Sequence, residues 1–234
     1  MNHTIWQPVL DKLPGWIEAS ALDLPGHGQR TDASFTDLAD LTKDLQAQCK
    51  SIKKPGQPLM LVGWSLGALP CLQLGVEGSK AVDALLLVSS NPCFVSRENG
   101  DYGIDGEIFN SFAQSLKKDF SGTIRRFLSL QVKGSASGRE ILRNLREKIL
   151  QQPQPDESCL DAGLAILQQV DLRDAPAKIK QPLQWILGEQ DSLVKAELAQ
   201  TLAQVSVFEK AGHAPFLSHT EMFVEQLVNQ IKKI

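Results

Sequence analysis

The sequence predicts an α/β fold in which a mostly parallel sheet is flanked by helices, and three observations support it. Short apolar runs alternate with segments of helical periodicity, which is typical of a parallel sheet covered on both faces. The chain has 234 residues, enough for one domain with a sizeable core. Each apolar run ends in glycine, serine, aspartate or histidine, and such sheets carry their sites at the carboxyl ends of their strands. The expected strands are 17–26, 58–63, 84–90, 182–191 and 205–213.

A long interval between the third and fourth expected strands breaks this alternation. Apolar residues between 108 and 127 recur every three or four positions, and "REILRNLREKIL" at 139–150 repeats the pattern. We therefore expect one domain, 1–234, with a helical lid, 91–180, inserted into it.

Composition excludes several classes of protein. A net charge of −3 makes nucleic acid an improbable partner. No apolar stretch approaches the roughly 20 residues that span a bilayer, and the start resembles no secretory leader, so we expect a cytoplasmic protein without a membrane partner. The four cysteines are far apart and form no C-x-x-C pair, so we expect buried reduced thiols and no metal site.

The pentapeptide Gly-Trp-Ser-Leu-Gly, residues 63–67, contains the first candidate catalytic residue. It lies between an apolar run and a helix-forming segment, the setting in which G-x-S-x-G forms a sharp turn that exposes the serine. We expect the two glycines to keep side chains out of a close backbone crossing. Ser65 is therefore the expected nucleophile.

A serine nucleophile needs a base, and four histidines are available. His213 follows the last expected strand, in a loop between Gly212 and Pro215, and is the expected base. His27 and His219 are expected to shape loops or line a pocket.

Asp191 is the expected acid that orients the base. It follows the fourth expected strand at the same edge of the sheet. The chain order Ser65, Asp191, His213 is that of α/β hydrolases and differs from the two common protease orders. Asp171 and Asp174 are the alternative acids and are expected to close off the lid.

Six segments together resemble one family. "DLPGHG", "GWSLGA", "SSNPCF", "RRFLSLQ", "VDLRD" and "GHAPFLSH" are similar to those of the pimeloyl-acyl carrier protein methyl ester esterases of biotin synthesis, carboxylesterases of the α/β hydrolase superfamily. The resemblance runs from about Trp6 to the end of the chain. It implies that Ser65, Asp191 and His213 form the triad and that the backbone N–H of Leu66 is an oxyanion donor. It also implies an acyl pocket lined by Phe127, Leu128, Ser129, Leu130 and Gln131.

The charge of the lid favours an acidic carrier as partner. Residues 111–150 hold nine basic and three acidic side chains, which gives +6 and leaves −9 for the rest of the chain. Arg139, Arg143 and Arg146 are four and three residues apart, so on a helix they form one stripe opposite apolar residues. Such a stripe is also compatible with an ordinary solvated helix face. The resemblance implies that Arg126, Arg139 and Arg143 dock an acyl carrier protein with its phosphopantetheine-linked acyl ester.

The beginning of the chain departs from the family pattern. Family members begin with strands that lead into an "HG" loop, which gives a second oxyanion donor, and "MNHTIW" matches the segment after that loop. Relative to the family the chain is therefore N-terminally truncated, and we expect Met1 to be internal to a longer natural chain. Because paired strands lie about 4.8 Å apart, a missing strand between 17–24 and 58–63 would leave a gap of roughly twice that width.

These patterns predict ester hydrolysis through an acyl-enzyme, by a monomer that needs no cofactor or metal. Two alternatives stay open: a general short-chain carboxylesterase, and a catalytically impaired hydrolase-like binding protein.

Overall fold

A four-stranded parallel sheet forms the centre of the molecule. The computed structural model describes residues 2–97, 101–131 and 136–234, without the side chains of 130, 131, 136–139, 141 and 150. The strands lie in the order β1-β2-β3-β4, and all neighbours are parallel. Their bounds are Met60–Trp64 (β1), Ala84–Val88 (β2), Leu183–Gly188 (β3) and Val205–Phe208 (β4). Every residue of β2 is buried, as expected for a central parallel strand that is covered on both faces.

The prediction of a strand at residues 17–26 is wrong. Residues 17–24 form no strand, and 25–29 make a turn in which Gly26 and Gly28 adopt positive φ. The apolar pattern of this segment is strand-like, but a strand needs a hydrogen-bonded neighbour, and β1 is the edge of the described sheet. Among the described residues no strand lies between 17–24 and β1, where the sequence predicted a gap.

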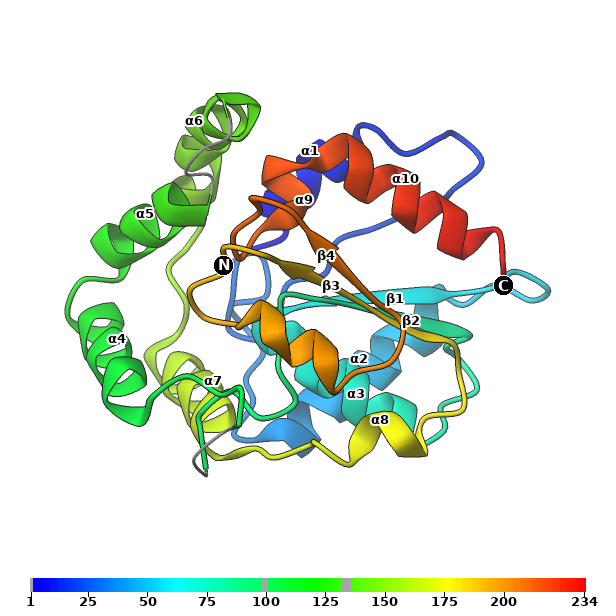
Figure 1. Ribbon diagram of the computed structural model, residues 1–234, viewed down its shortest axis with the longest axis horizontal. Helices are drawn as coiled ribbons and strands as arrows, with labels where there is room; N and C mark the ends of the chain where they lie inside the picture. The colour runs from blue at the N-terminus through cyan, green and yellow to red at the C-terminus, as the bar shows by residue number, and fades with distance from the viewer. Residues whose placement is uncertain (1, 98–100, 132–135) are drawn as a thin grey trace.

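Helices cover both faces of the sheet (Figure 1). One face carries α2, α3 and α8, and the other carries α1, α9 and α10. The strand β1 shows how the alternation of side chains divides the core: Met60, Val62 and Trp64 pack on one side, whereas Leu61 packs on the other. These helices are Leu38–Ile52 (α2), Ala68–Val76 (α3), Ala175–Lys178 (α8), Gln7–Leu10 (α1), Pro215–Ser218 (α9) and Thr220–Ile231 (α10). Single 3₁₀ turns lie at His3–Trp6 (η1), Ser65–Gly67 (η2) and Ala196–Gln200 (η3).

A helical segment separates β2 from β3 and lies at one end of the sheet (Figure 1). It consists of Gly106–Lys118 (α4), Phe120–Gln131 (α5), Ala136–Gln151 (α6) and Glu157–Gln169 (α7). Asp105 and Asp156 cap α4 and α7, because each carboxylate accepts hydrogen bonds from two N–H groups of the first turn. The helices predicted for this interval are confirmed over its described residues. That residues 91–180 form a lid inserted into the domain stays a prediction.

Two further findings concern the cysteines and the membrane. Cys49, Cys71, Cys93 and Cys159 are all buried and free, as predicted. Burial raises the pKa of the Cys49 thiol to about 11.

In the described part of the chain no helix has the length and apolar character to cross a membrane.

Candidate active site

Ser65 lies on a strained turn between β1 and α3. The strand ends at Trp64, η2 begins at Ser65, and Ser65 has a φ of 53°, in the left-handed region that non-glycine residues rarely adopt. Gly63 is needed for this crossing, because a Cβ there would lie 2.7 Å from the Cα of Ala68. Gly67 is not, since a Cβ on Gly67 would meet nothing within 4 Å. The expectation that both glycines prevent a clash is therefore wrong for Gly67.

His213 and Asp191 meet Ser65 in one hydrogen-bonded array. The Nε2 of His213 lies 2.9 Å from the Oγ of Ser65, and its Nδ1 lies 2.8 Å from Oδ2 of Asp191. The side chains of His213 and Asp191 are fully buried. The N–H groups of Leu193 and Val194 donate to Oδ1 of Asp191, at 2.8 and 3.1 Å. These two hydrogen bonds fix the orientation of the carboxylate, so that its second oxygen, Oδ2, faces the imidazole of His213.

Two aromatic side chains position the histidine loop. The indole Nε1–H of Trp64 donates to the carbonyl of His213 at 2.7 Å, which ties the loop to the end of β1. The ring of Phe127 meets the His213 ring edge-on, with centroids 5.6 Å apart. The helical segment thus contributes directly to the wall around the imidazole.

The N–H of Leu66 stays the predicted oxyanion donor. Leu66 is the second residue of η2, and the first N–H groups of a helix have no partner within it. The Leu66 side chain lies close to Gly163 of α7, where an added Cβ would come within 3.1 Å. The residue is therefore held between the turn and the helical segment.

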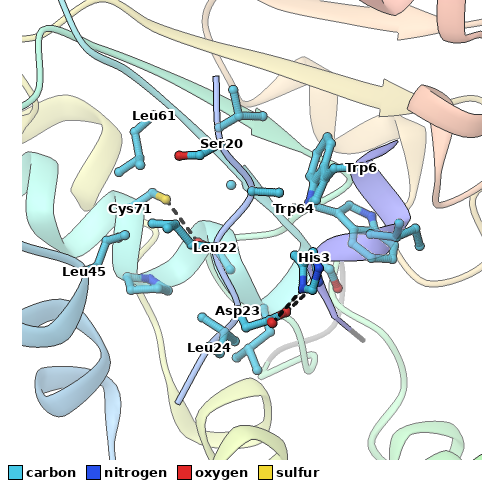
Figure 2. Close-up of a pocket in the computed structure, with 18 of the residues that line it drawn as sticks. His3, Trp6, Ser20, Leu22, Asp23, Leu24, Leu45, Leu61, Trp64 and Cys71 are labelled. Carbon is cyan, nitrogen blue, oxygen red and sulfur yellow. Dashed lines mark hydrogen bonds and ion pairs between the residues drawn. The ribbon is translucent and has the colours of Figure 1, made fainter. Parts of the chain in front are cut away.

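A cavity of about 950 Å³ opens beside Ser65. Side chains of the helical segment, of β1, of residues 16–24 and of α10 line it. Figure 2 shows the part of the cavity that contains Ser20, Leu22 and Leu61. Phe127 lines this cavity, and its role in binding an acyl chain stays a prediction. Leu128 is buried in the core and Ser129 is exposed, so these two predicted pocket residues do not line it, because consecutive residues of a helix face different directions. The side chains of Leu130 and Gln131 lie outside the described residues.

A second histidine–aspartate pair, which no sequence motif predicted, lies in this cavity. Nδ1 of His3 is 2.8 Å from Oδ2 of Asp23, and the backbone N–H of His3 donates to Oδ1 of Asp23 at 2.5 Å. Both residues line the cavity, and Figure 2 shows them together. The aspartate precedes the Pro-Gly-His-Gly turn, and Gly28 is needed there because a Cβ would strike the Asp23 carboxylate. The segment Asp-Leu-Pro-Gly-His-Gly, residues 23–28, therefore indicated that Asp23 sits beside a turn, but nothing in the sequence indicated that His3 binds it.

The remaining predicted polar residues have local roles. His27 lines the cavity, its Nδ1 is 2.9 Å from the carbonyl of Pro25, and burial lowers its pKa to about 4. His219 lies 2.8 Å from the Ser218 hydroxyl, and burial lowers its pKa as well. Asp171 accepts hydrogen bonds from the Arg173 guanidinium, which lowers the pKa of the carboxyl.

The basic side chains of the helical segment face outward where they are described. Arg126, Arg143 and Arg146 are exposed, whereas Leu142 and Leu145 on the opposite side of α6 are buried, as the helical spacing predicted. Arg126 lies 4.0 Å from Asp119, an exposed contact of little energy. The side chain of Arg139 lies outside the described residues. No group of three potential metal ligands occurs in the part of the chain that the structure describes.

Comparison with known proteins decides the family. A model of the alpha/beta hydrolase family matches residues 1–226. The chain belongs to the alpha/beta hydrolase family. The resemblance to the pimeloyl-acyl carrier protein methyl ester esterases is confirmed by curated relatives of that name. The one from Pectobacterium carotovorum is 36% identical over 97% of this chain and 89% of its own length. That from Pseudoalteromonas atlantica is 38% identical, with the same coverage.

Solved structures agree with this family. An esterase from Exiguobacterium antarcticum superposes with a TM-score of 0.83 at 21% identity, covering 99% of this chain and 88% of the other. A bromoperoxidase from Bacillus anthracis gives the same TM-score at 16% identity, over 100% and 88%. At these identities the likeness shows the fold alone, so the activity rests on the sequence relatives. As a member of this esterase group within the alpha/beta hydrolases, the chain is a carboxylic ester hydrolase.

Proposed function

We propose that this hydrolase cleaves the methyl ester of a pimeloyl group carried on acyl carrier protein, a step of biotin synthesis. The observation that carries the proposal is the array of Ser65, His213 and Asp191 at the wall of an apolar cavity. The named substrate of the relatives, which match over nearly the whole chain, supports this ester among the many that such an array could cleave.

Each member of the array has one role in the proposed reaction. Ser65 attacks the ester carbonyl while Nε2 of His213 accepts its proton. Asp191 holds Nδ1–H and so keeps Nε2 free to act as the base. The N–H of Leu66 donates to the oxyanion, and protonated His213 returns the proton to the departing methanol. Water then hydrolyses the acyl-enzyme by the same groups, without a cofactor or metal.

The cavity beside Ser65 suits an acyl chain. Phe112, Phe127 and Leu164 bring apolar side chains to it from three helices, and burial of each methylene there contributes about 0.8 kcal/mol. In the proposed substrate the chain joins the ester at one end to the carrier at the other. The carrier must therefore remain outside the cavity mouth.

The exposed arginines of the helical segment are the proposed contacts for the carrier. Arg126 and Arg143 are exposed on adjacent helices, α5 and α6. An acidic carrier and its phosphopantetheine phosphate complement this charge, and such contacts act mainly on the rate of association.

The chemistry is tested by turnover of pimeloyl-acyl carrier protein methyl ester. We expect Ser65→Ala to abolish both turnover and labelling by a fluorophosphonate while the protein remains folded. Labelling that survives Ser65→Ala would assign the nucleophile elsewhere, and folded wild-type protein that neither labels nor turns over would support a catalytically silent binding protein.

The partner is tested separately by charge reversal. Arg126→Glu with Arg143→Glu should raise KM for the carrier-linked ester while leaving hydrolysis of a soluble p-nitrophenyl ester unchanged. The matched control is Lys43→Glu with Lys50→Glu, an equal change of charge on exposed positions of α2. Equal effects on both esters, or equal effects of both double variants, would contradict carrier docking and favour a general short-chain carboxylesterase.

A further inference from the structure

The strands β1 and β2 end level with each other, and the chain turns sharply after each of them. The two strands are paired in parallel, with Trp64 opposite Val88 at their carboxyl ends (Figure 1). The next residues are Ser65 and Ser89, and both adopt a positive φ, 53° and 43°. This conformation is unfavourable for a residue with a side chain, and it persists only where surrounding contacts hold it. The contacts that hold these two turns therefore determine the geometry around the proposed nucleophile.

A serine of the second turn is hydrogen-bonded to the first turn. The hydroxyl of Ser90 donates to the backbone carbonyl of Ser65, with the two oxygens 3.1 Å apart. Ser90 is fully buried, and a hydrogen bond in such a low-dielectric surrounding is stronger than one in water. The N–H of Ala68, at the start of α3, donates to the same carbonyl. The Ser65 carbonyl thus accepts from its own turn and from the end of the neighbouring strand.

Ser90 is itself fixed in place by its neighbours in the chain. The N–H of Ser89 donates to the carbonyl of Ile186 at 2.8 Å, which ties the turn to β3. The side-chain amide of Asn91 donates to the carbonyl of Tyr102 at 3.1 Å. The residue before Ser90 and the residue after it are therefore both anchored. The Ser90 hydroxyl is presented to the neighbouring turn from a rigid frame.

A peptide plane links the Ser65 carbonyl to the proposed oxyanion donor. A trans peptide unit is planar, and its C=O and N–H groups point in opposite directions. The carbonyl of Ser65 and the N–H of Leu66 belong to one such unit, since no cis peptide bond occurs in the described part of the chain. A donor that fixes the direction of this carbonyl therefore also fixes the direction of the Leu66 N–H. An oxyanion donor stabilises the transition state only when it is aimed at the place where negative charge develops.

We propose that Ser90 is a positioning residue for ester hydrolysis, which holds the Ser65–Leu66 peptide so that the Leu66 N–H points at the oxyanion. This inference rests on the proposed roles of Ser65 and Leu66 and adds a third residue to them. Ser90 does not touch the substrate, and it acts only through the peptide that it binds. Without its hydroxyl, the Ser65 carbonyl would keep the bond from Ala68 and lose the bond from the end of β2. The Leu66 N–H would then be aimed at the oxyanion for a smaller fraction of the time.

The adjacent residue supplies a matched control. Ser89 is also fully buried, and its Oγ has no hydrogen-bond partner among the described residues. Ser89→Ala and Ser90→Ala each remove one buried hydroxyl from the same turn, and only the second removes a bond to the Ser65 carbonyl. Loss of an unpaired hydroxyl leaves no other group unsatisfied, so Ser89→Ala should keep the kinetics of wild type.

The assay is hydrolysis of a soluble p-nitrophenyl ester, with active sites counted by complete fluorophosphonate labelling so that unfolded protein does not enter kcat. Loss of a whole oxyanion donor costs about 10²–10³ in kcat, and in Ser90→Ala the bond from Ala68 remains. We therefore expect Ser90→Ala to lower kcat about tenfold and to leave KM within about twofold. The pH midpoint of kcat/KM should stay that of wild type, because the base, His213, keeps its hydrogen bond to Asp191.

A trifluoromethyl ketone inhibitor tests the oxyanion directly. Ser65 adds to the carbonyl carbon of the ketone while His213 takes the hydroxyl proton, and the carbonyl oxygen becomes an oxyanion. This reversible adduct resembles the tetrahedral transition state, so its affinity follows the stabilisation of that state. The inhibition constant should rise in Ser90→Ala by about the factor by which kcat falls, and it should stay unchanged in Ser89→Ala.

Three results would overturn the proposal: equal kinetics of the two alanine variants, a change confined to KM, or an unchanged inhibition constant in Ser90→Ala. If Ser90→Ala does not fold, Ser90→Cys takes its place, because a thiol is close in size to the hydroxyl and a much weaker donor. Folded wild-type protein that binds no fluorophosphonate would contradict the proposed function itself, and this inference with it. Labelling of the wild type therefore distinguishes the two failures.

Discussion

Replacement of Asp191 by asparagine should inactivate the proposed triad while it preserves the shape of the site. The two N–H groups of Leu193 and Val194 already donate to Oδ1 of Asp191. An asparagine must place its oxygen there, because its NH₂ cannot accept from them. The NH₂ would then face Nδ1 of His213, which now lies 2.8 Å from the carboxylate. His213 would have to accept at Nδ1 and carry its proton on Nε2.

This tautomer cannot act as the base for Ser65. A proton on Nε2, which lies 2.9 Å from the Oγ of Ser65, leaves no lone pair to accept the serine proton. In a serine protease the corresponding substitution lowers kcat by about 10⁴, equivalent to about 5.5 kcal/mol of transition-state stabilisation. We expect a loss of the same order in kcat for a soluble p-nitrophenyl ester, with KM little changed, and a matching loss in the rate of fluorophosphonate labelling.

The comparison variant is Asp171→Asn. The Asp171 carboxylate is bound by Arg173, so its replacement should leave kcat within about twofold of wild type while costing at most about 1 kcal/mol of stability. If Asp191→Asn retained activity within tenfold of wild type, the tautomer argument would be refuted. Inactivation by Asp171→Asn would point to that aspartate as the orienting acid.

Three further predictions concern stability and positioning. Gly63→Ala should lower the free energy of unfolding by about 1–3 kcal/mol in denaturant titrations, because its Cβ would lie 2.7 Å from backbone, whereas Gly67→Ala should change it by less than about 1 kcal/mol. Burial lowers the pKa of His27 from 6.5 to about 4, so the unfolded chain binds the proton more readily than the folded chain does. The free energy of unfolding should therefore fall by roughly 3 kcal/mol as the pH drops from 6.5 to 4. His27→Gln should reduce this pH dependence in thermal melts. Trp64→Phe removes the hydrogen bond to the His213 carbonyl and should lower kcat about tenfold more than it changes KM, and a pure KM effect would contradict this positioning role.

The local sequence pattern was sufficient to predict the strands that position Ser65, Asp191 and His213. The run before Gly63 becomes β1, and the runs that end near Asp191 and His213 become β3 and β4 with the loops that follow them. Parallel strands have their carboxyl ends at one edge of the sheet. Residues that follow three such strands could therefore be predicted to meet there, as Ser65, Asp191 and His213 do. The helical segment was equally accessible, since its amphipathic period is a local property.

Contacts between distant segments were not accessible in this way. Trp64 binds the carbonyl of a residue 149 positions later, and His3 meets Asp23 through a turn whose path depends on Gly26 and Gly28. Two residues of the predicted acyl pocket, Leu128 and Ser129, do not line the cavity, for a related reason. A sequence motif marks a segment, but the rotation of a helix about its axis decides which of its side chains reaches a cavity.

The failure at residues 17–24 concerns the nature of a strand. Ile17, Ala19 and Ala21 alternate with Glu18 and Ser20, as in a half-buried strand. Alternation reports side-chain environment only, whereas a strand exists when two backbones satisfy each other's hydrogen bonds. Residues 17–24 have the side-chain alternation of a strand, but within the described part of the chain the main-chain groups of 18–22 make no hydrogen bond, so the alternation alone could not make them a strand.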